Sequence, residues 1–364
     1  MKRKYVCAII SMLIVLLITG CWDSKDVDNR MIVGAIGIEQ AEADHQKVKV
    51  WFRFPIPKTP GNNSKGKDFF STSQVGETVV EATNLLRFRL PKALDLSSTR
   101  AFLIKDTIAE TGLRKYLEFS IRERSVPLDT VIALVSGKME KIFSSANPTG
   151  ELSGIYTKLF FEPYAGGIPR KNKVTLWEVY AKLLNPMQSN LIPLLKETEH
   201  NMFSLVGNAY FSGERMMGVL SPDESLLYEI INERIGEAEI ELTEKADMKI
   251  LKNHTKMKVG LKSDGKPLIQ IQSGITVTLI DSSQDEKLNS TQTEQYLEKM
   301  LTVQAQSLFE KTQKSKSDIF GFGNRYRSIL QQHQYKQWPE MYKNADIRFR
   351  IKVHLRNTGL EFLK

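Results

Sequence analysis

The N-terminal segment determines where the rest of this chain can fold. It begins with Lys2, Arg3 and Lys4, continues as an apolar stretch from Tyr5 to Ile18, and ends in Thr19-Gly20-Cys21. A basic n-region, a short apolar h-region and small residues before a cleavage point define a secretory signal peptide. We therefore predict that residues 1–20 are removed and that the rest of the chain folds outside the cytoplasm.

Cys21 makes this a lipoprotein signal, because only cysteine offers a sulfur nucleophile for a lipid. We expect Cys21 to become an N-palmitoyl, S-diacylglyceryl cysteine. One acyl chain binds a membrane marginally, whereas two hold it stably. The alternative is an uncleaved membrane helix, which needs about 20 apolar residues and leaves Gly20-Cys21 unexplained. The expected location is the outer face of the cytoplasmic membrane, with the lipid as the anchor.

The two cysteines also limit how the body can be stabilised. Cys7 lies in the signal and Cys21 carries the lipid, so no thiol pair remains for a disulfide or a cysteine metal site. Side-chain packing must therefore hold the core, and 41% of the residues are hydrophobic. The five histidines are scattered, without a His or Cys partner at ligand spacing. We expect neither a metal nor a cofactor.

The charge of the chain limits the class of partner. The formal net charge is +9 over 364 residues. A mild basic excess suits a protein that lies near anionic lipid. The basic residues are too dispersed to predict binding to nucleic acid.

Length and segment order predict the domains and the fold class. A chain of 364 residues suggests two or three domains. Gly150 to Arg170 is rich in Gly and Pro and indicates a boundary, and the chain becomes β-rich from Ala238. We predict a signal at residues 1–20, an N-terminal domain at 21–165, a small middle domain at 166–233 and a C-terminal domain at 234–364. Little βαβ regularity is present, so the predicted class is α+β with largely antiparallel sheets.

Several local patterns predict individual elements. Thr175 with Glu178 forms a capping box, and Ser221 with Pro222 and Glu224 forms another strong helix start. The longest predicted helix opens at Thr291 and carries an apolar stripe, so we expect it to pack on a sheet of the C-terminal domain. The residues of that stripe are Leu297, Met300, Leu301, Ala305, Leu308 and Phe309.

The last predicted strand, residues 347–355, has the cleanest alternation in the chain. Its apolar residues point one way, and Arg348, Arg350 and Lys352 point the other. One interpretation is an ordinary solvated face, or an edge strand kept charged against aggregation. The other is an electrostatic contact with lipid headgroups or an acidic partner.

No motif for catalysis stands out. The run from Asp318 to Gly323 contains two glycines but lacks a third glycine and a Lys-Ser/Thr pair, and it follows a helix rather than a strand. We interpret it as a helix exit where Gly supplies left-handed backbone angles and the Phe residues enter the core. Trp338 is predicted to be a buried anchor rather than a ligand platform. We therefore expect no enzymatic activity.

Taken in order, several segments resemble the Ger(x)C family, the lipoprotein C subunits of spore-germination nutrient receptors. Trp338 also falls where that family tends to carry a tryptophan. The segments that carry the resemblance are Gly20-Cys21-Trp22-Asp23, Gly34 to Ile38, Gly207 to Leu227, Asp318 to Gly323, and Arg356-Asn357-Thr358-Gly359.

This resemblance implies three mixed α/β domains and a non-enzymatic subunit on the outer face of the inner spore membrane. It implies two integral membrane partners, an A subunit and a transporter-like B subunit, and a requirement for the chain in the germination response. Only Cys21 carries over with a defined role. Two other functions stay open at this point: a solute-binding lipoprotein of an ABC importer, and an exported cell-wall enzyme.

Overall fold

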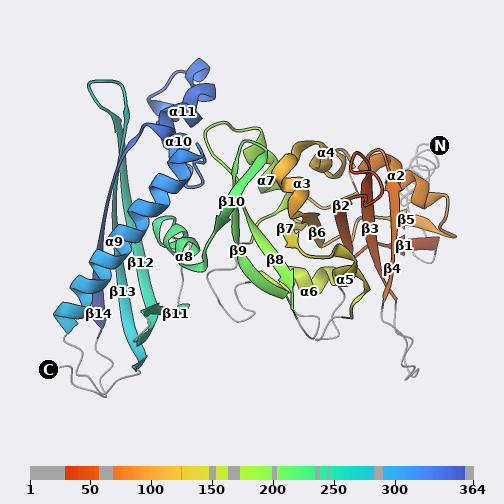
Figure 1. Ribbon diagram of the computed structural model, residues 1–364, viewed down its shortest axis with the longest axis horizontal. Helices are drawn as coiled ribbons and strands as arrows, with labels where there is room; N and C mark the ends of the chain where they lie inside the picture. Colours follow the sequence, from red (N-terminus) through yellow and green to blue (C-terminus); the bar gives the residue numbers. More distant parts are fainter. Residues whose placement is uncertain are drawn as a thin grey trace, which may run out of the picture.

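A computed structural model describes most of the chain from residue 29 onward. The residues described are 29–56, 69–123, 125–146, 153–162, 173–198, 203–233, 238–243, 246–282 and 290–356. They form two modules that lie side by side along the long axis (Figure 1). The N-terminal module is built on an eight-stranded sheet, and the C-terminal module is built on a four-stranded sheet.

The N-terminal sheet is mixed, with the order β10-β9-β8-β7-β6-β2-β3-β4. The four central strands β8, β7, β6 and β2 run parallel, and the strands on both sides of them pair antiparallel. The central strands read as continuous apolar runs because helices cover both faces. The strands are β2 (Ala35–Gln40), β3 (Val48–Pro55), β4 (Phe69–Gly76), β6 (Ala101–Lys105), β7 (Val131–Ser136), β8 (Leu191–Glu197), β9 (Phe203–Ser212) and β10 (Arg215–Leu220).

Helices and a small strand pair complete this module. One face of the sheet packs against α2, α3, α4 and α7, and the other face packs against α5 and α6. A separate parallel pair, β1 with β5, lies beside β3 at the end of the molecule farthest from the C-terminal module (Figure 1). The elements are β1 (Arg30–Ile32), α2 (Val79–Arg87), β5 (Ala93–Asp95), α3 (Asp106–Thr111), α4 (Arg114–Arg122), α5 (Met139–Ser144), α6 (Ser153–Phe160) and α7 (Leu176–Leu183).

The C-terminal sheet has the order β11-β12-β13-β14, in which only β13 and β14 pair parallel. The long helix α9 and the shorter α8, α10 and α11 cover one face of this sheet. The elements are α8 (Pro222–Ile231), β11 (Ala238–Thr243), β12 (Ala246–Leu261), β13 (Pro267–Ser282), α9 (Ser290–Lys314), α10 (Phe322–Arg325), the 3-10 turns η3 (Tyr326–Ser328) and η4 (Gln332–Gln337), α11 (Trp338–Lys343) and β14 (Asp346–Arg356).

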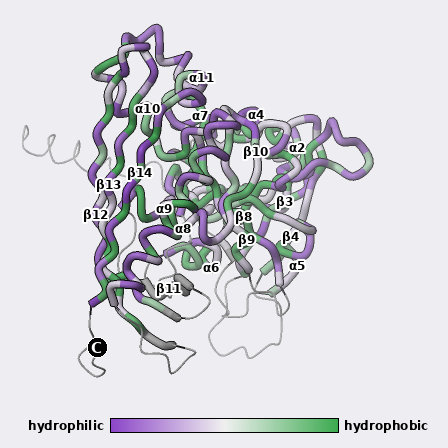
Figure 2. The backbone as a smooth tube through the Cα atoms, turned by 60° about the vertical axis from the view of Figure 1, so that its left-hand side comes forward, coloured by the Kyte–Doolittle hydropathy of each residue, from purple (hydrophilic) through white to green (hydrophobic). Residues whose placement is uncertain are grey.

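Strict alternation along β14 separates the covered face from the open one. Buried and exposed residues follow each other along the whole strand after Asp346. Figure 2 shows the same alternation of hydrophilic and hydrophobic residues along the long strands β12 to β14. Because side chains of a strand alternate between faces, the helices bury one set and leave the other set in solvent.

The core runs without interruption from one module into the other. Met187, Leu191, Tyr210 and Leu220 of the N-terminal module belong to the same buried cluster as the residues of α9 and the C-terminal sheet. The two modules therefore share apolar packing, and α8 lies between them (Figure 1).

The α+β class and the long C-terminal helix on a sheet are confirmed, and both large sheets contain parallel as well as antiparallel pairs. The predicted domain boundaries at 165 and 233 stay a prediction, and the strands β8 to β10 extend the sheet that begins with β2. The helix predicted to open at Thr291 begins one residue earlier, at Ser290.

Candidate functional site: the basic face and the module junction

The predicted lipid site lies outside the described residues. Cys21 precedes the first described strand, β1, which begins at Arg30. Arg30 Nη1 donates to Asp95 Oδ2 at 2.7 Å and so fixes β1 to β5. The described chain therefore begins at the outer end of the N-terminal module (Figure 1).

The three basic residues predicted from β14 lie together on its open face. Arg348 pairs with Asp346 at 3.0 Å, and Lys352 pairs with Glu298 at 3.3 Å. Arg350 lies between them and has no carboxylate at ion-pair distance among the described residues. His354 continues the row beyond Lys352.

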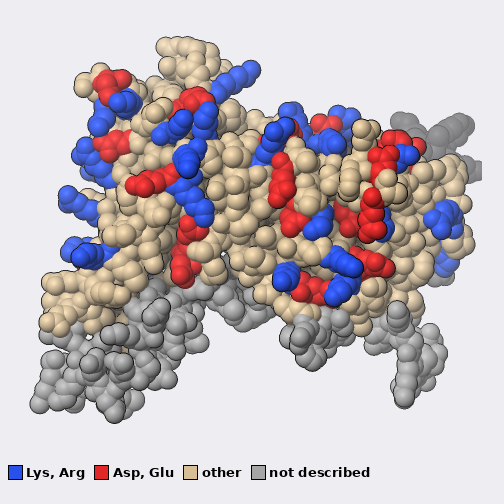
Figure 3. Space-filling model, in the orientation of Figure 1, with Lys and Arg blue, Asp and Glu red and all other residues tan. Residues whose placement is uncertain are grey.

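Strand β12 adds a second basic row to the same face, which the sequence reasoning missed. Lys252, His254, Lys256 and Lys258 are all exposed and occupy alternate positions. The register places these residues across β13 from the basic residues of β14. We call the outward side chains Lys252 to Lys258 and Arg348 to His354 the basic face. Basic side chains project along the molecular edge beside this sheet (Figure 3, left).

A buried carboxylate organises the opposite, covered side of the C-terminal module. Asp318 accepts hydrogen bonds from the backbone N–H of Phe322 at 3.1 Å and of Gly323 at 2.8 Å. It also accepts from the indole N–H of Trp338 at 2.9 Å. Burial raises the pKa of Asp318 to about 6, and these three donors limit the rise by stabilising the charged form.

The predicted left-handed glycine and buried Phe side chains are confirmed in this loop, but Gly321 is not the exit of α9, which ends at Lys314; it precedes α10 as its N-cap. Gly321 has φ 70°, in the left-handed region, and Phe320 and Phe322 are buried. Trp338 is fully buried, as predicted. Its ring packs on Tyr326 with centroids 4.8 Å apart. The run from Asp318 to Gly323 is thus a structural loop, with its carboxylate turned into the protein.

Polar contacts from this loop hold the segment that follows α7. The backbone N–H of Ser189 donates to the carbonyl of Asp318 at 2.8 Å. Asn324 Nδ2 donates to Gln188 at 2.9 Å, and Asn185 Nδ2 donates to Asn324 at 3.0 Å. We call this set of contacts between residues 185–190 and 318–327 the module junction. It joins the two modules through side chains more than a hundred positions apart in the sequence.

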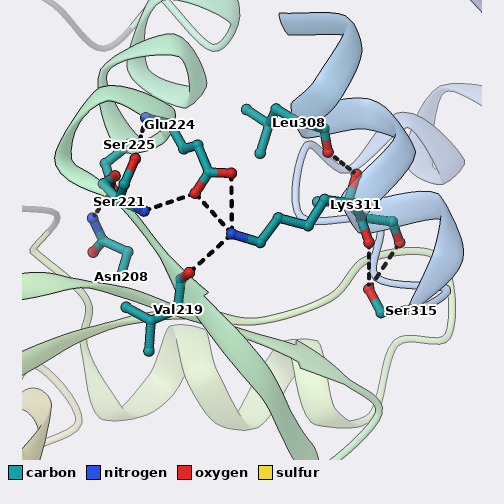
Figure 4. Close-up of polar contacts among 9 residues, drawn as sticks. Asn208, Val219, Ser221, Glu224, Ser225, Leu308, Lys311 and Ser315 are labelled. Atoms are coloured by element: carbon teal, nitrogen blue, oxygen red, sulfur yellow. Dashed lines mark hydrogen bonds and ion pairs between the residues drawn. The ribbon is translucent and has the colours of Figure 1, made fainter. Parts of the chain in front are cut away.

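Lys311 forms a second link between the modules (Figure 4). Its ammonium on α9 donates to Glu224 Oε2 at 2.8 Å and to the carbonyl of Val219 in β10 at 3.1 Å. Glu224 also accepts from the backbone N–H of Ser221, which completes the capping box of α8. One carboxylate therefore starts α8 and fixes α9 against the hairpin of the N-terminal module.

Chemistry-bearing groups are sparse in the described part of the chain. No set of three His, Cys, Asp or Glu side chains there could hold a metal ion. Among the same residues, no helix combines the length and the apolar character that crossing a membrane requires. What the described residues offer is a charged face at one end and a packed junction between two modules.

Comparison with known proteins identifies the family. The model described as the spore germination protein N-terminal domain matches residues 23–197. The model described as spore germination B3/GerAC-like, C-terminal, matches residues 206–359. The first match ends with β8, and the second covers most of β9, all of β10 and the C-terminal module. The last two strands of the N-terminal sheet therefore belong to the second match.

Full-length relatives and one solved structure agree with these matches. Spore germination protein B3 of Bacillus subtilis is 22% identical, over 94% of this chain and 95% of its own length. Spore germination protein GerQC of Bacillus cereus is 20% identical, over 98% of both chains. The crystal structure of the GerBC protein superposes with a TM-score of 0.55 at 16% identity, covering 88% of this chain and 97% of that chain, and so shows the same fold. The chain belongs to the GerAC-like family of spore germination proteins, the germinant-receptor C subunits that its residues resemble.

Proposed function

We propose that this chain is the lipid-anchored coupling subunit of a spore nutrient-germinant receptor, working with integral membrane A and B subunits. The lipid on Cys21 confines the body to the outer face of the membrane that holds those partners. Confinement raises the local concentration of the body, so weak contacts suffice to keep the subunits together. The proposal assigns no catalytic step to the chain.

The shared core between the modules is the observation that carries the coupling role. Met187 and Leu220 of the N-terminal module are buried in the same cluster as Phe309 of α9. Packed cores deform little and transmit displacement. A contact at one end of the body is therefore felt at the other end, as a coupling subunit requires.

The residues at the N-terminus support a lipid anchor. Gly20-Cys21 follows an apolar segment and precedes a polar stretch that contains Asp23, Ser24 and Lys25. A two-chain lipid on one cysteine suffices for stable attachment. This arrangement holds the body beside its partners in the membrane.

Affinity capture from spore membranes tests the proposal. We expect the tagged full-length chain to bring down two integral membrane proteins encoded as germinant-receptor A and B subunits. A tagged, unrelated lipoprotein of the same membrane, produced at the same level, serves as the control. Recovery of this chain alone, under detergent conditions that keep other membrane complexes intact, would contradict the proposal.

A further inference from the structure

We propose that the basic face of the C-terminal sheet is a docking surface for a carboxylate-rich surface of a partner protein. The inference uses the proposed function only to say that partner proteins lie nearby. Its chemistry rests on the sheet itself.

The register of β12, β13 and β14 arranges the charged side chains in regular rows. Lys256 lies across Gln272 from Arg350, and Lys258 lies across Gln270 from Arg348. Successive rows are about 7 Å apart along the strands, and β12 is about 10 Å from β14. The middle strand supplies neutral amides between the cations. The face therefore offers charged donors on both sides of a row that both donates and accepts hydrogen bonds.

Carboxylates lie at the margins of the basic face but not at its centre. Asp346 lies at one end with Lys262, Glu298 lies beside Lys352, and Glu233 lies beside His254. Within the described ranges, Lys256, Lys258 and Arg350 have no ion-pair partner. The cations of this face lie about 7–10 Å apart and repel one another, and salt screens this repulsion only in part. The centre of the face thus carries a cost that a bound carboxylate surface would relieve.

Protection of the sheet edge does not account for these charges. The free edge of β14 is already occupied by two glutamates of α9. Glu298 accepts from the backbone N–H of Val353 at 3.1 Å, and Glu294 accepts from that of Leu355 at 2.7 Å. The part of the edge near Val353 and Leu355 is thus already protected against strand pairing. Lys252 to Lys258 lie beyond the stretch of β12 that pairs with β11, and their side chains project from the open face of the sheet.

The direction of the face favours a protein over the lipid to which the chain is anchored. The covered side of the sheet receives α8, since Asn253 and Thr255 of β12 donate to the carbonyl of Ile230. The basic face therefore points away from α8 and from the N-terminal module, at the opposite end of the molecule from β1 (Figure 1).

The tether is too short to bring this face flat onto the same bilayer. From Cys21 to Arg30 an extended chain spans at most about 30 Å. The six strand spacings from β3 to β10 alone cover roughly 29 Å. The helix and sheet layers of the C-terminal module add about 10 Å each. A body held at Cys21 thus presents the face sideways or outward, to neighbouring proteins.

Arginine and lysine on a flat sheet suit carboxylates of a protein surface. The guanidinium of Arg350 can bind a carboxylate through two parallel hydrogen bonds. Lysine ammonium groups act as point charges that steer a partner during encounter. Association at such a face should weaken as salt rises, because exposed charges about 10 Å apart are screened at physiological ionic strength.

Site-specific photo-crosslinking in spores tests the inference. Gln272, in the centre of the face, is replaced by p-benzoylphenylalanine in the full-length lipidated chain, with the same replacement at Lys299 on α9 as the control position. We expect an adduct from Gln272, mapping to a carboxylate-rich segment of one protein, and none of that adduct from Lys299. Charge reversal by Lys256→Glu, Lys258→Glu and Arg350→Glu should lower its yield at least about tenfold.

A matched reversal of Lys299, Lys314 and Lys336, which are exposed outside the sheet, should leave the yield within about twofold. Reversing the mapped partner segment to lysine should restore the adduct of the triple reversal. Adducts with phospholipid alone, no protein adduct, or a yield indifferent to the reversal would each overturn the inference. An adduct on a protein other than the A or B subunit would support this inference and contradict the partners proposed above.

Discussion

Lys311 on α9 and Glu224 in the first turn of α8 are 87 residues apart in the sequence, and their charged groups meet at 2.8 Å. The same ammonium bonds the carbonyl of Val219 at the end of β10. The contact joins a helix of the C-terminal module to the last strand of the N-terminal sheet. It is the polar counterpart of the core that the two modules share.

Removing this ammonium should loosen the modules. We expect Lys311→Met to lower the free energy of unfolding by about 1–2 kcal/mol, because a partly buried carboxylate and a carbonyl lose their donor. Urea denaturation measures the effect. Lys314→Met, on an exposed position of the same helix, is the control and should change stability by less than about 0.5 kcal/mol. Equal effects of the two substitutions would show that the contact contributes nothing.

The module junction leaves no room at Gly323. A Cβ added there would lie 2.4 Å from the carbonyl oxygen of Met187 and 2.5 Å from the indole nitrogen of Trp338. Gly323→Ala should therefore destabilise the protein by about 3 kcal/mol. Gly260→Ala, where a Cβ meets nothing within 4 Å, should stay within about 0.5 kcal/mol of wild type. Thermal unfolding of both variants measures the loss of stability. An alanine at 323 that leaves stability unchanged would refute this packing.

The buried carboxylate makes stability depend on pH. The folded-state pKa of Asp318 is raised from 3.8 to about 6 by burial. Its contribution to stability is therefore fully present below pH 3.8 and is lost as the pH rises through about 6. Relative to Asp318→Asn, wild type should lose roughly 3 kcal/mol between pH 4 and pH 7. The measurement is the difference in unfolding free energy between the two proteins across that range, and a constant difference would contradict the raised pKa.

The glutamates on the edge of β14 should keep the protein monodisperse. Glu294→Ala combined with Glu298→Ala frees the backbone N–H groups of Val353 and Leu355, which then can pair with another strand. We expect concentration-dependent association in sedimentation velocity experiments. Glu310→Ala, exposed on the same helix, is the control. If the double variant sediments as wild type does, the glutamates do not guard the edge.

Local sequence signals predict much of this fold because their partners are close in the chain. The capping boxes at Thr175 and Ser221 form as predicted. The period-two pattern predicts the faces of β14, and the glycine at 321 predicts a left-handed turn. Each of these features depends on residues a few positions apart, where propensity and geometry act directly.

The pairing of strands that are far apart in the chain could not be predicted from the sequence. Nothing in residues 191–197 says that β8 will join β7 in parallel, and nothing in β13 says that β14 will return beside it after α9. The second row of the basic face was missed for this reason, although Lys252 to Lys258 alternate visibly. Lys311 likewise gives no sign of Glu224, because their contact depends on how two modules pack.

Germination of spores that carry Cys21→Ala tests the central claim most directly. The account predicts a folded body that leaves the membrane fraction and a germination response to nutrient that falls at least about tenfold, since local concentration is lost with the tether. Cys7→Ala, at the only other cysteine, should leave both unchanged. Normal germination by Cys21→Ala spores at wild-type protein level would contradict the account.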